Sequence, residues 1–125
     1  MARSQAKSKR KISGGRYRSS RGKKKYELAG FSTNTKLGKE NKVRVKRTIG
    51  GNIKKYTLTT KFINVTDKKG KTQKTEVLNV VENPANPNLV RRNIITKGAV
   101  VETKLGKVKI TSRPGQEGSI NGVLV

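Results

Sequence analysis

The large apolar side chains of this chain are unevenly distributed, which limits the part of it that can fold around a core. Residues 1–42 contain only four residues of the Val, Ile, Leu and Phe set, whereas residues 43–125 contain 25. A segment with so little apolar area cannot offset the conformational entropy that it loses on ordering. We therefore expect two parts: an extension over residues 1–42, disordered when free, and a small folded domain over residues 43–125.

Short apolar runs separated by turn signals predict strands within the folded domain. Turns are expected at Gly50-Gly51-Asn52, at Asp67–Gly70 and at Arg113-Pro114-Gly115. No amphipathic helix of more than two turns follows residue 42, so nothing would cover an open sheet. The pattern favours an all-β fold, a closed or nearly closed β-barrel of six to seven short strands with a long irregular basic N-terminal extension.

Three local expectations accompany the barrel. The segment from Leu89 to Val101 is typical of one long or two short strands, and Tyr56 and Phe62 follow the strand pattern of core residues. The segment from Arg21 to Leu28 is compatible with a short helix or with irregular structure.

The charge of the chain points to a polyanionic partner. Lys and Arg number 31 against seven acidic residues, which gives a net charge of +24. A compact domain with this excess repels itself until a polyanion neutralises it and sheds its counterions. No apolar run exceeds three residues, Trp is absent, and no apolar stretch follows the basic N-terminus. We therefore expect nucleic acid as the partner, with no membrane association and no secretory signal.

The residue types that carry most catalysis and metal binding are missing. The chain has no Cys and no His, which excludes disulfides, thiolate metal sites and the commonest general base. The seven carboxylates are dispersed, and no Ser–Lys pair stands out from the rest. We expect no enzymatic activity, no small-molecule substrate, no cofactor and no metal ion.

The basic residues of the extension are the first candidates for nucleic-acid contact. They are interleaved with Ser and Gly, and the paired glycines would allow the backbone to approach a phosphate closely. Tyr17 has the chemistry to stack on a base. A solvated tail or a nuclear-localisation run over residues 7–11 is the alternative. The predicted contacts in the extension are Arg3, Lys7, Lys9, Arg10, Lys11, Gly14, Gly15, Arg16, Tyr17, Arg18, Arg21, Lys23, Lys24, Lys25 and Lys36.

A second set of candidates lies in the domain, mostly in or beside turns. Arg91 and Arg92 favour nucleic-acid contact because guanidinium forks match phosphates, whereas Lys68, Lys69 and Lys71 are more typical of cations that protect a sheet edge. The predicted contacts in the domain are Arg44, Asn52, Lys54, Arg91, Arg92, Lys97 and Arg113.

Several motifs together resemble a known family. They are RKISGGRYRSSRGKKKYEL over residues 10–28, GGN at 50–52, VVENPAN at 80–86, LVRR at 89–92 and SRPGQ at 112–116. In this order they resemble the archaeal and eukaryotic small-subunit ribosomal protein eight, the e-type family, in its compact archaeal form. The resemblance covers essentially the whole chain. It implies a β-barrel body, a basic extension threaded into small-subunit ribosomal RNA, and no catalysis.

The leading hypothesis is therefore a structural protein of the small ribosomal subunit. It would act in the cytoplasm, bind small-subunit ribosomal RNA beside neighbouring small-subunit proteins, and not form a homo-oligomer. A DNA-compacting protein fits the charge equally well but normally dimerises or inserts apolar wedges. An RNA-acting enzyme is disfavoured because His is absent and the acids are not clustered.

Overall fold

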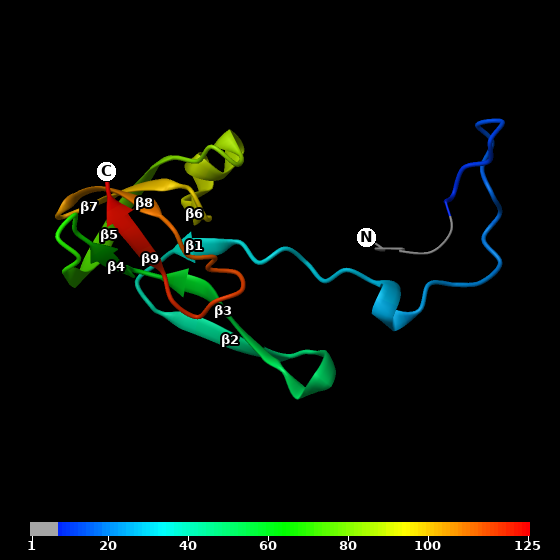
Figure 1. Ribbon diagram of the computed structural model, residues 1–125, viewed down its shortest axis with the longest axis horizontal. Coiled ribbons are helices and arrows are strands. Elements are labelled where there is room, and N and C mark those ends of the chain that lie inside the picture. The colour runs from blue at the N-terminus through cyan, green and yellow to red at the C-terminus, as the bar shows by residue number, and fades with distance from the viewer. Residues whose placement is uncertain (1–7) are drawn as a thin grey trace. The chain divides into compact units, whose positions relative to one another are not determined.

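The computed structural model describes residues 8–125 and divides the chain into two units, Met1–Ser32 and Thr33–Val125. The described residues contain nine strands and three short 3-10 helices (Figure 1). The 3-10 helices are η1 (Lys25–Glu27), η2 (Ile49–Gly51) and η3 (Pro87–Arg92). The all-β prediction is confirmed. The barrel was expected to contain six to seven strands; the structure places five strands in a closed barrel and four in a second sheet.

Five strands close a barrel within the second unit. They are β4 (Phe62–Thr66), β5 (Thr72–Glu82), β7 (Val100–Thr103), β8 (Gly106–Ile110) and β9 (Asn121–Leu124). Neighbours pair antiparallel in that order, and β9 returns to β4 in parallel to close the ring. Closure leaves none of these strands as an exposed edge.

A four-stranded sheet adjoins the barrel in the same unit, in the order β2-β3-β1-β6. Its strands are β1 (Thr35–Leu37), β2 (Lys42–Arg47), β3 (Ile53–Thr60) and β6 (Ile94–Ile95). Strand β1 pairs in parallel with β3 and antiparallel with β6. The folded unit thus takes in residues upstream of the boundary at 42 that the distribution of apolar residues suggested.

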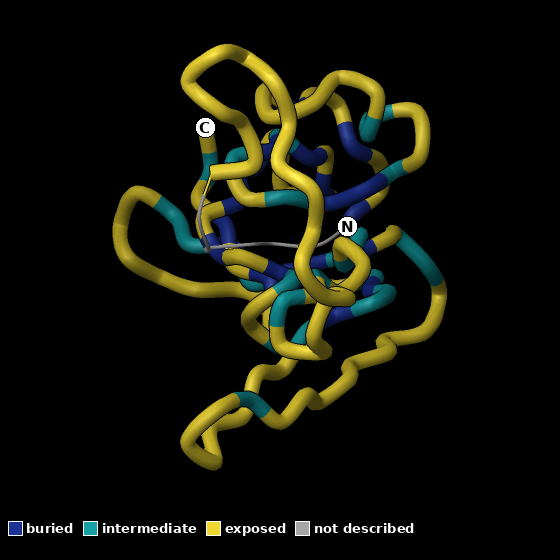
Figure 2. The backbone as a smooth tube through the Cα atoms, turned by 90° about the vertical axis from the view of Figure 1, so that its right-hand side faces the viewer, coloured by how far each residue is buried: buried dark blue, intermediate teal, exposed yellow. Residues whose placement is uncertain are grey.

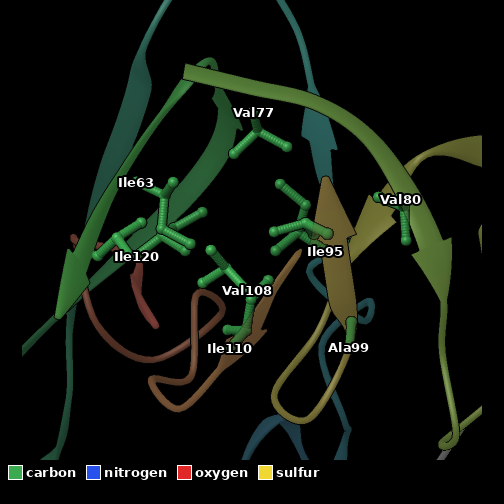
Figure 3. Packing of buried hydrophobic residues seen from close by; sticks show 10 residues of the cluster. Ile63, Val77, Val80, Ile95, Ala99, Val108, Ile110 and Ile120 are labelled. Atoms are coloured by element: carbon green, nitrogen blue, oxygen red, sulfur yellow. The ribbon is translucent and has the colours of Figure 1, made fainter. Parts of the chain in front are cut away.

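The core lies inside the barrel. Val65, Val101 and Val108 are completely buried, and Ile95 from β6 joins the same cluster. Figure 3 shows side chains of this cluster, Ile63, Val108 and Ile95 among them, pointing toward one interior from several strands. Gly122 of β9 fits because it has no side chain: a Cβ there would lie 2.5 Å from Val108 Cγ1. Strands built mostly from Val and Ile pack well on such a pleated interior.

The expected strand over residues 89–101 is only partly correct. Its first part is η3, which begins at Pro87, ends at Arg92 and is followed by Asn93 with φ of 49°. The Asn86 side chain caps this helix by accepting from the Asn88 N–H at 3.0 Å. A cap followed directly by proline favours a helical turn over an extended chain. Strands β6 and β7 account for the rest of the segment.

Two residues expected in the core lie outside it. Phe62 is 39% exposed, and Lys74 Nζ lies 4.7 Å from the centroid of its ring. Tyr56 is half-buried. The extended strand is interrupted at Lys61, between β3 and β4. In β4, the side chains of Ile63 and Val65 point into the core and that of Phe62 points outward. The change of parity at this point in the sequence marks that break.

Candidate nucleic-acid interface

The first unit contains a small hairpin over residues 9–17, here called the arm hairpin. The Lys11 N–H donates to the Gly15 carbonyl at 2.7 Å, and the Gly14 N–H donates to the Lys11 carbonyl at 3.0 Å. Gly14 has φ of 82°, a left-handed conformation that favours glycine. This pattern is a three-residue turn closed by a glycine bulge. Sequence reasoning missed it, although SGG beside alternating bases is a usable hairpin signal.

The side chains of Arg10, Lys11 and Tyr17 make contacts within the arm hairpin. Arg10 and Arg16 lie opposite each other in its bridge. The Arg10 guanidinium also donates to the Gly14 carbonyl at 2.8 Å. Lys11 Nζ lies 5.7 Å from the centroid of the Tyr17 ring, so Tyr17 already has a cation above it. The structure therefore gives Arg10 a role in holding the turn.

A second turn of the extension is held by an ion pair. The Arg21 guanidinium donates to both carboxylate oxygens of Glu27, at 2.7 and 3.2 Å, and the Lys24 N–H donates to Glu27 at 2.9 Å. The hydrogen bonds from Arg21 and from the Lys24 backbone lower the pKa of Glu27. Arg21 is thus committed to a partner within the chain, while Lys23 and Lys25 remain exposed. The helix left open over residues 21–28 is only the single turn η1.

The extension exposes nearly all of its side chains. Every residue from 8 to 26 is exposed, as the yellow tube of the arm shows in Figure 2. Arg3 and Lys7, two of the predicted contacts, lie outside the described residues. All the other predicted contact residues, in the extension and in the domain, are exposed. Contact between them and RNA stays a prediction.

The β2–β3 hairpin is the most basic element of the second unit and runs out from its body to the tip at η2 (Figure 1). Residues directly opposite in an antiparallel pair share a face. Arg44 faces Tyr56, and Lys46 faces Lys54. Arg44, Lys46 and Lys54 therefore form one cationic face, and no acidic residue occurs between residues 41 and 66. Lys46 was missed among the sequence candidates.

The opposite face and the tip of this hairpin are partly apolar. Val45, Ile49 and Ile53 are 59, 94 and 62% exposed. Val43, Val45 and Ile49 follow the two-residue period of a strand, but β2 is exposed along its whole length. Asn52 closes the tip, because its amide donates to the Ile49 carbonyl at 3.2 Å and its own carbonyl accepts from the Thr48 N–H at 2.7 Å. The predicted contact Asn52 therefore has a structural task in the turn.

The remaining candidates of the second unit lie on separate elements. Arg91 and Arg92 occupy the last turn of η3, and Lys97 lies in the turn before β7. Lys36 is on β1. Arg113 begins a loop that is tied to β3, where the Thr57 N–H donates to the Pro114 carbonyl at 2.9 Å. The contacts of these residues do not join them into one cluster.

The carboxylates of the described residues are dispersed, and no group of three or more of them would hold a metal ion. Within residues 8–125, no helix has the length and apolar character needed to cross a membrane. Glu76 instead bridges two bases, accepting from Lys61 at 2.7 Å and Lys104 at 3.0 Å. These hydrogen bonds, that of Lys61 first, hold the pKa of Glu76 below its ordinary value.

The sequence is similar to proteins of one family along nearly its whole length. The family model described as ribosomal protein S8e matches residues 4–125. The small ribosomal subunit protein eS8 of Methanocorpusculum labreanum is 52% identical over 122 residues, which cover 97% of each chain. That of Methanobrevibacter smithii is 52% identical over 126 residues, covering both chains completely. That of Methanocella arvoryzae is 51% identical over 97% of each chain.

These matches confirm the family resemblance seen in the motifs of the sequence. They span the extension as well as the barrel, so both units are part of what the relatives share. The chain belongs to the ribosomal protein S8e family.

Proposed function

We propose that this protein is a structural, non-catalytic constituent of the small ribosomal subunit and supports translation in the cytoplasm. It binds small-subunit ribosomal RNA through the basic extension and through the cationic face of the β2–β3 hairpin. Relatives about half identical over their full length are named as small ribosomal subunit proteins, which supports the structural role. Its other partners are neighbouring small-subunit proteins, and it acts without a membrane, a small-molecule substrate or a second copy of itself.

One observation carries the RNA-binding part of the proposal. Residues 1–25 contain eleven Lys and Arg residues and no acidic residue. Each of these basic side chains that lies within the described residues is exposed. Cations displayed along an extended chain reach many phosphates at once. Their affinity comes mainly from the counterions that the RNA releases.

The two units have different roles in this proposal. The barrel buries the apolar side chains and gives the protein a fixed shape. The extension has too little apolar area to fold alone, so the RNA replaces the missing core and orders it on binding. Cationic segments between RNA helices reduce the repulsion of their phosphates, which allows the helices to pack.

Two charge-matched triple variants test this proposal. Lys23, Lys24 and Lys25 are changed to Gln in one, and Lys68, Lys69 and Lys71 in the other. Each loses three positive charges, but only the first set belongs to the extension. Association with small subunits is measured by sedimentation at increasing salt. The extension variant should dissociate at lower salt than wild type, and the barrel variant should remain bound.

Three outcomes contradict the proposal. Equal loss in both variants would mean that association depends on net charge alone. Wild-type behaviour of the extension variant would mean that its lysines do not contact the particle. Recovery of the wild-type protein with nuclease-sensitive DNA, and not with small subunits, would favour DNA compaction.

A further inference from the structure

Charged residues face each other across strands at three places in the described chain. Glu102 of β7 faces Lys107 of β8, an attractive pair. The other two pairs have like charge: Arg10 faces Arg16 in the arm hairpin, and Lys46 faces Lys54 in the β2–β3 hairpin. Like charges directly opposite on one face destabilise a hairpin. Both repulsive pairs lie on hairpins whose Lys and Arg side chains are exposed to solvent.

The turn between β4 and β5 has the same backbone pattern as the arm hairpin but a different pair of flanking residues. At Asp67, the N–H donates to the Lys71 carbonyl and the carbonyl accepts from the Gly70 N–H, both at 2.9 Å, with φ of 80° at Gly70. Lys11, Gly15 and Gly14 repeat this pattern. The pair flanking the barrel turn is Thr66 and Thr72, whose hydroxyls are 3.3 Å apart.

The equivalent positions in the arm hairpin hold Arg10 and Arg16. The same backbone turn is therefore flanked by a neutral, hydrogen-bonded pair in the barrel and by two guanidiniums in the arm. Neither arginine makes a salt bridge with a carboxylate among the described residues. An isolated two-stranded hairpin is marginal in water even without such repulsion.

The second like-charge pair has the same setting. Neither Lys46 nor Lys54 forms a salt bridge within the described part of the chain. Arg44 lies two residues before Lys46 on the same face and adds a third cation. The acid-free stretch between residues 41 and 66 leaves this face without an internal counter-charge.

We propose that each like-charge pair is a phosphate site, in which one phosphodiester group of the RNA sits between the two facing cations. The inference deepens the proposed function, on which it rests, by naming the chemical group bound and the side chains that bind it. An anion between two cations replaces their repulsion with two charge-assisted hydrogen bonds. Arginine suits the arm site because its fork matches two phosphate oxygens.

Hairpin formation and phosphate binding are therefore coupled in the arm. The hairpin is formed in the structure. Repulsion between the facing Arg10 and Arg16 weakens this pairing, and a phosphate between them removes the repulsion and stabilises the hairpin. Arg10 is also a positioning residue, because its guanidinium is held near the turn by the Gly14 carbonyl.

The decisive variant gives the arm the flanking pair of the barrel turn: Arg10→Thr with Arg16→Thr in the full-length protein. The matched control is Arg18→Thr with Lys23→Thr, which removes the same charge from exposed positions outside the hairpin. Affinity for small-subunit ribosomal RNA is measured by filter binding. The pair variant should lose about tenfold more affinity than the control, the value of one charge-assisted contact.

Amide signals of Lys11 and Tyr17 report on the hairpin, since their N–H groups donate across it. In the free wild-type chain they should shift toward hairpin values when RNA is added. In the pair variant they should already have those values and change little. Inorganic phosphate should produce the same shift weakly in the wild type, and chloride at equal ionic strength should not. A shift with inorganic phosphate but none with RNA would mean an anion site that the RNA does not use, and would overturn the inference.

The second site has its own pair of variants. Lys46→Thr with Lys54→Thr removes the facing pair, and Arg47→Thr with Lys55→Thr removes equal charge from the other face of the same hairpin. Without RNA, the first variant should melt at or above the wild-type temperature. With RNA, it should bind several-fold more weakly than the second.

The outcomes separate this inference from the proposed function. Equal losses for pair and control variants would show that the cations act diffusely, which overturns the phosphate sites and leaves RNA binding intact. Unchanged affinity in all four variants would contradict RNA binding by these hairpins altogether. A lower melting temperature for the Lys46 and Lys54 variant would show that the pair stabilises the free fold, which also overturns the inference.

Discussion

Gly14 and Gly15 are adjacent in the sequence but hold different positions in the arm hairpin. The sequence predicted that both allow close approach of the backbone to phosphate. Gly14 has φ of 82° and is required by the turn itself, whereas no positive φ occurs at Gly15. A Cβ at Gly15 would meet only side-chain atoms of Lys11 and Ser13, at 3.7 Å. The two glycines therefore have separable roles that residue type alone does not reveal.

This difference gives a prediction. Gly14→Ala should disfavour the hairpin by about 1 kcal/mol, and Gly14→Asn should restore most of it, because Asn tolerates the left-handed region. Gly15→Ala should leave the hairpin intact and weaken RNA binding only if phosphate approaches the backbone there. Amide chemical shifts of the RNA-bound protein and filter binding measure the two effects. Equal tolerance of Ala at both positions would contradict the hairpin.

Glu76 provides a prediction on pH. Its pKa lies below the ordinary glutamate value because of hydrogen bonds from Lys61 and Lys104. A depressed pKa stabilises the fold above the unfolded-state pKa, and this contribution disappears as the pH falls through the folded-state value. Wild type should melt above Glu76→Gln at pH 7, and the two should converge as the pH falls through the folded-state pKa of Glu76. The control is Glu82→Gln, because the Glu82 carboxylate forms no salt bridge among the described residues. A difference that persists at acid pH would contradict this account.

At the scale of elements, the sequence predicted turns correctly, but it did not predict which apolar side chains are buried. Asp67–Gly70 indicated a hairpin turn, and the structure confirms it between β4 and β5. Val45 and Ile53 follow a strand alternation but lie on a hairpin that extends beyond the core. Alternation fixes which side chains share a face and does not say whether that face is covered. η3 was missed because the segment from Leu89 was expected to form strand, although Asn86 and Pro87 just before it are typical of a helix start.

The hairpin and the barrel should therefore respond differently to loss of apolar surface. Ile53 is 62% exposed and Ile63 is 1% exposed. Ile63→Ala should lower the free energy of unfolding by about 2–5 kcal/mol, the usual cost of a cavity at a buried Ile. Ile53→Thr should change it by less than about 0.5 kcal/mol, as surface substitutions do. Denaturant melts of the RNA-free protein compare the two. A large loss at Ile53 would mean that its face is covered in the folded protein.

At the scale of the whole molecule, the uneven distribution of charge and apolar residues was the most informative signal. It predicted a basic extension and a β domain, and the structure confirms the all-β barrel. Strand order was beyond the sequence, because pairings such as β1 with β3 and β6 join segments far apart in the chain. The RNA contacts follow from charge and exposure, and remain a prediction.

The most direct test of the account is the salt dependence of binding to small-subunit ribosomal RNA with and without residues 1–25. Their removal takes away eleven positive charges and lowers the net charge from +24 to +13. Each phosphate contact contributes roughly 0.7–0.9 to the slope of log affinity against log salt, so the truncated protein should show a slope several units shallower. The β domain should keep its melting temperature. An unchanged slope after truncation would contradict the account, because it would mean that the extension does not neutralise phosphates.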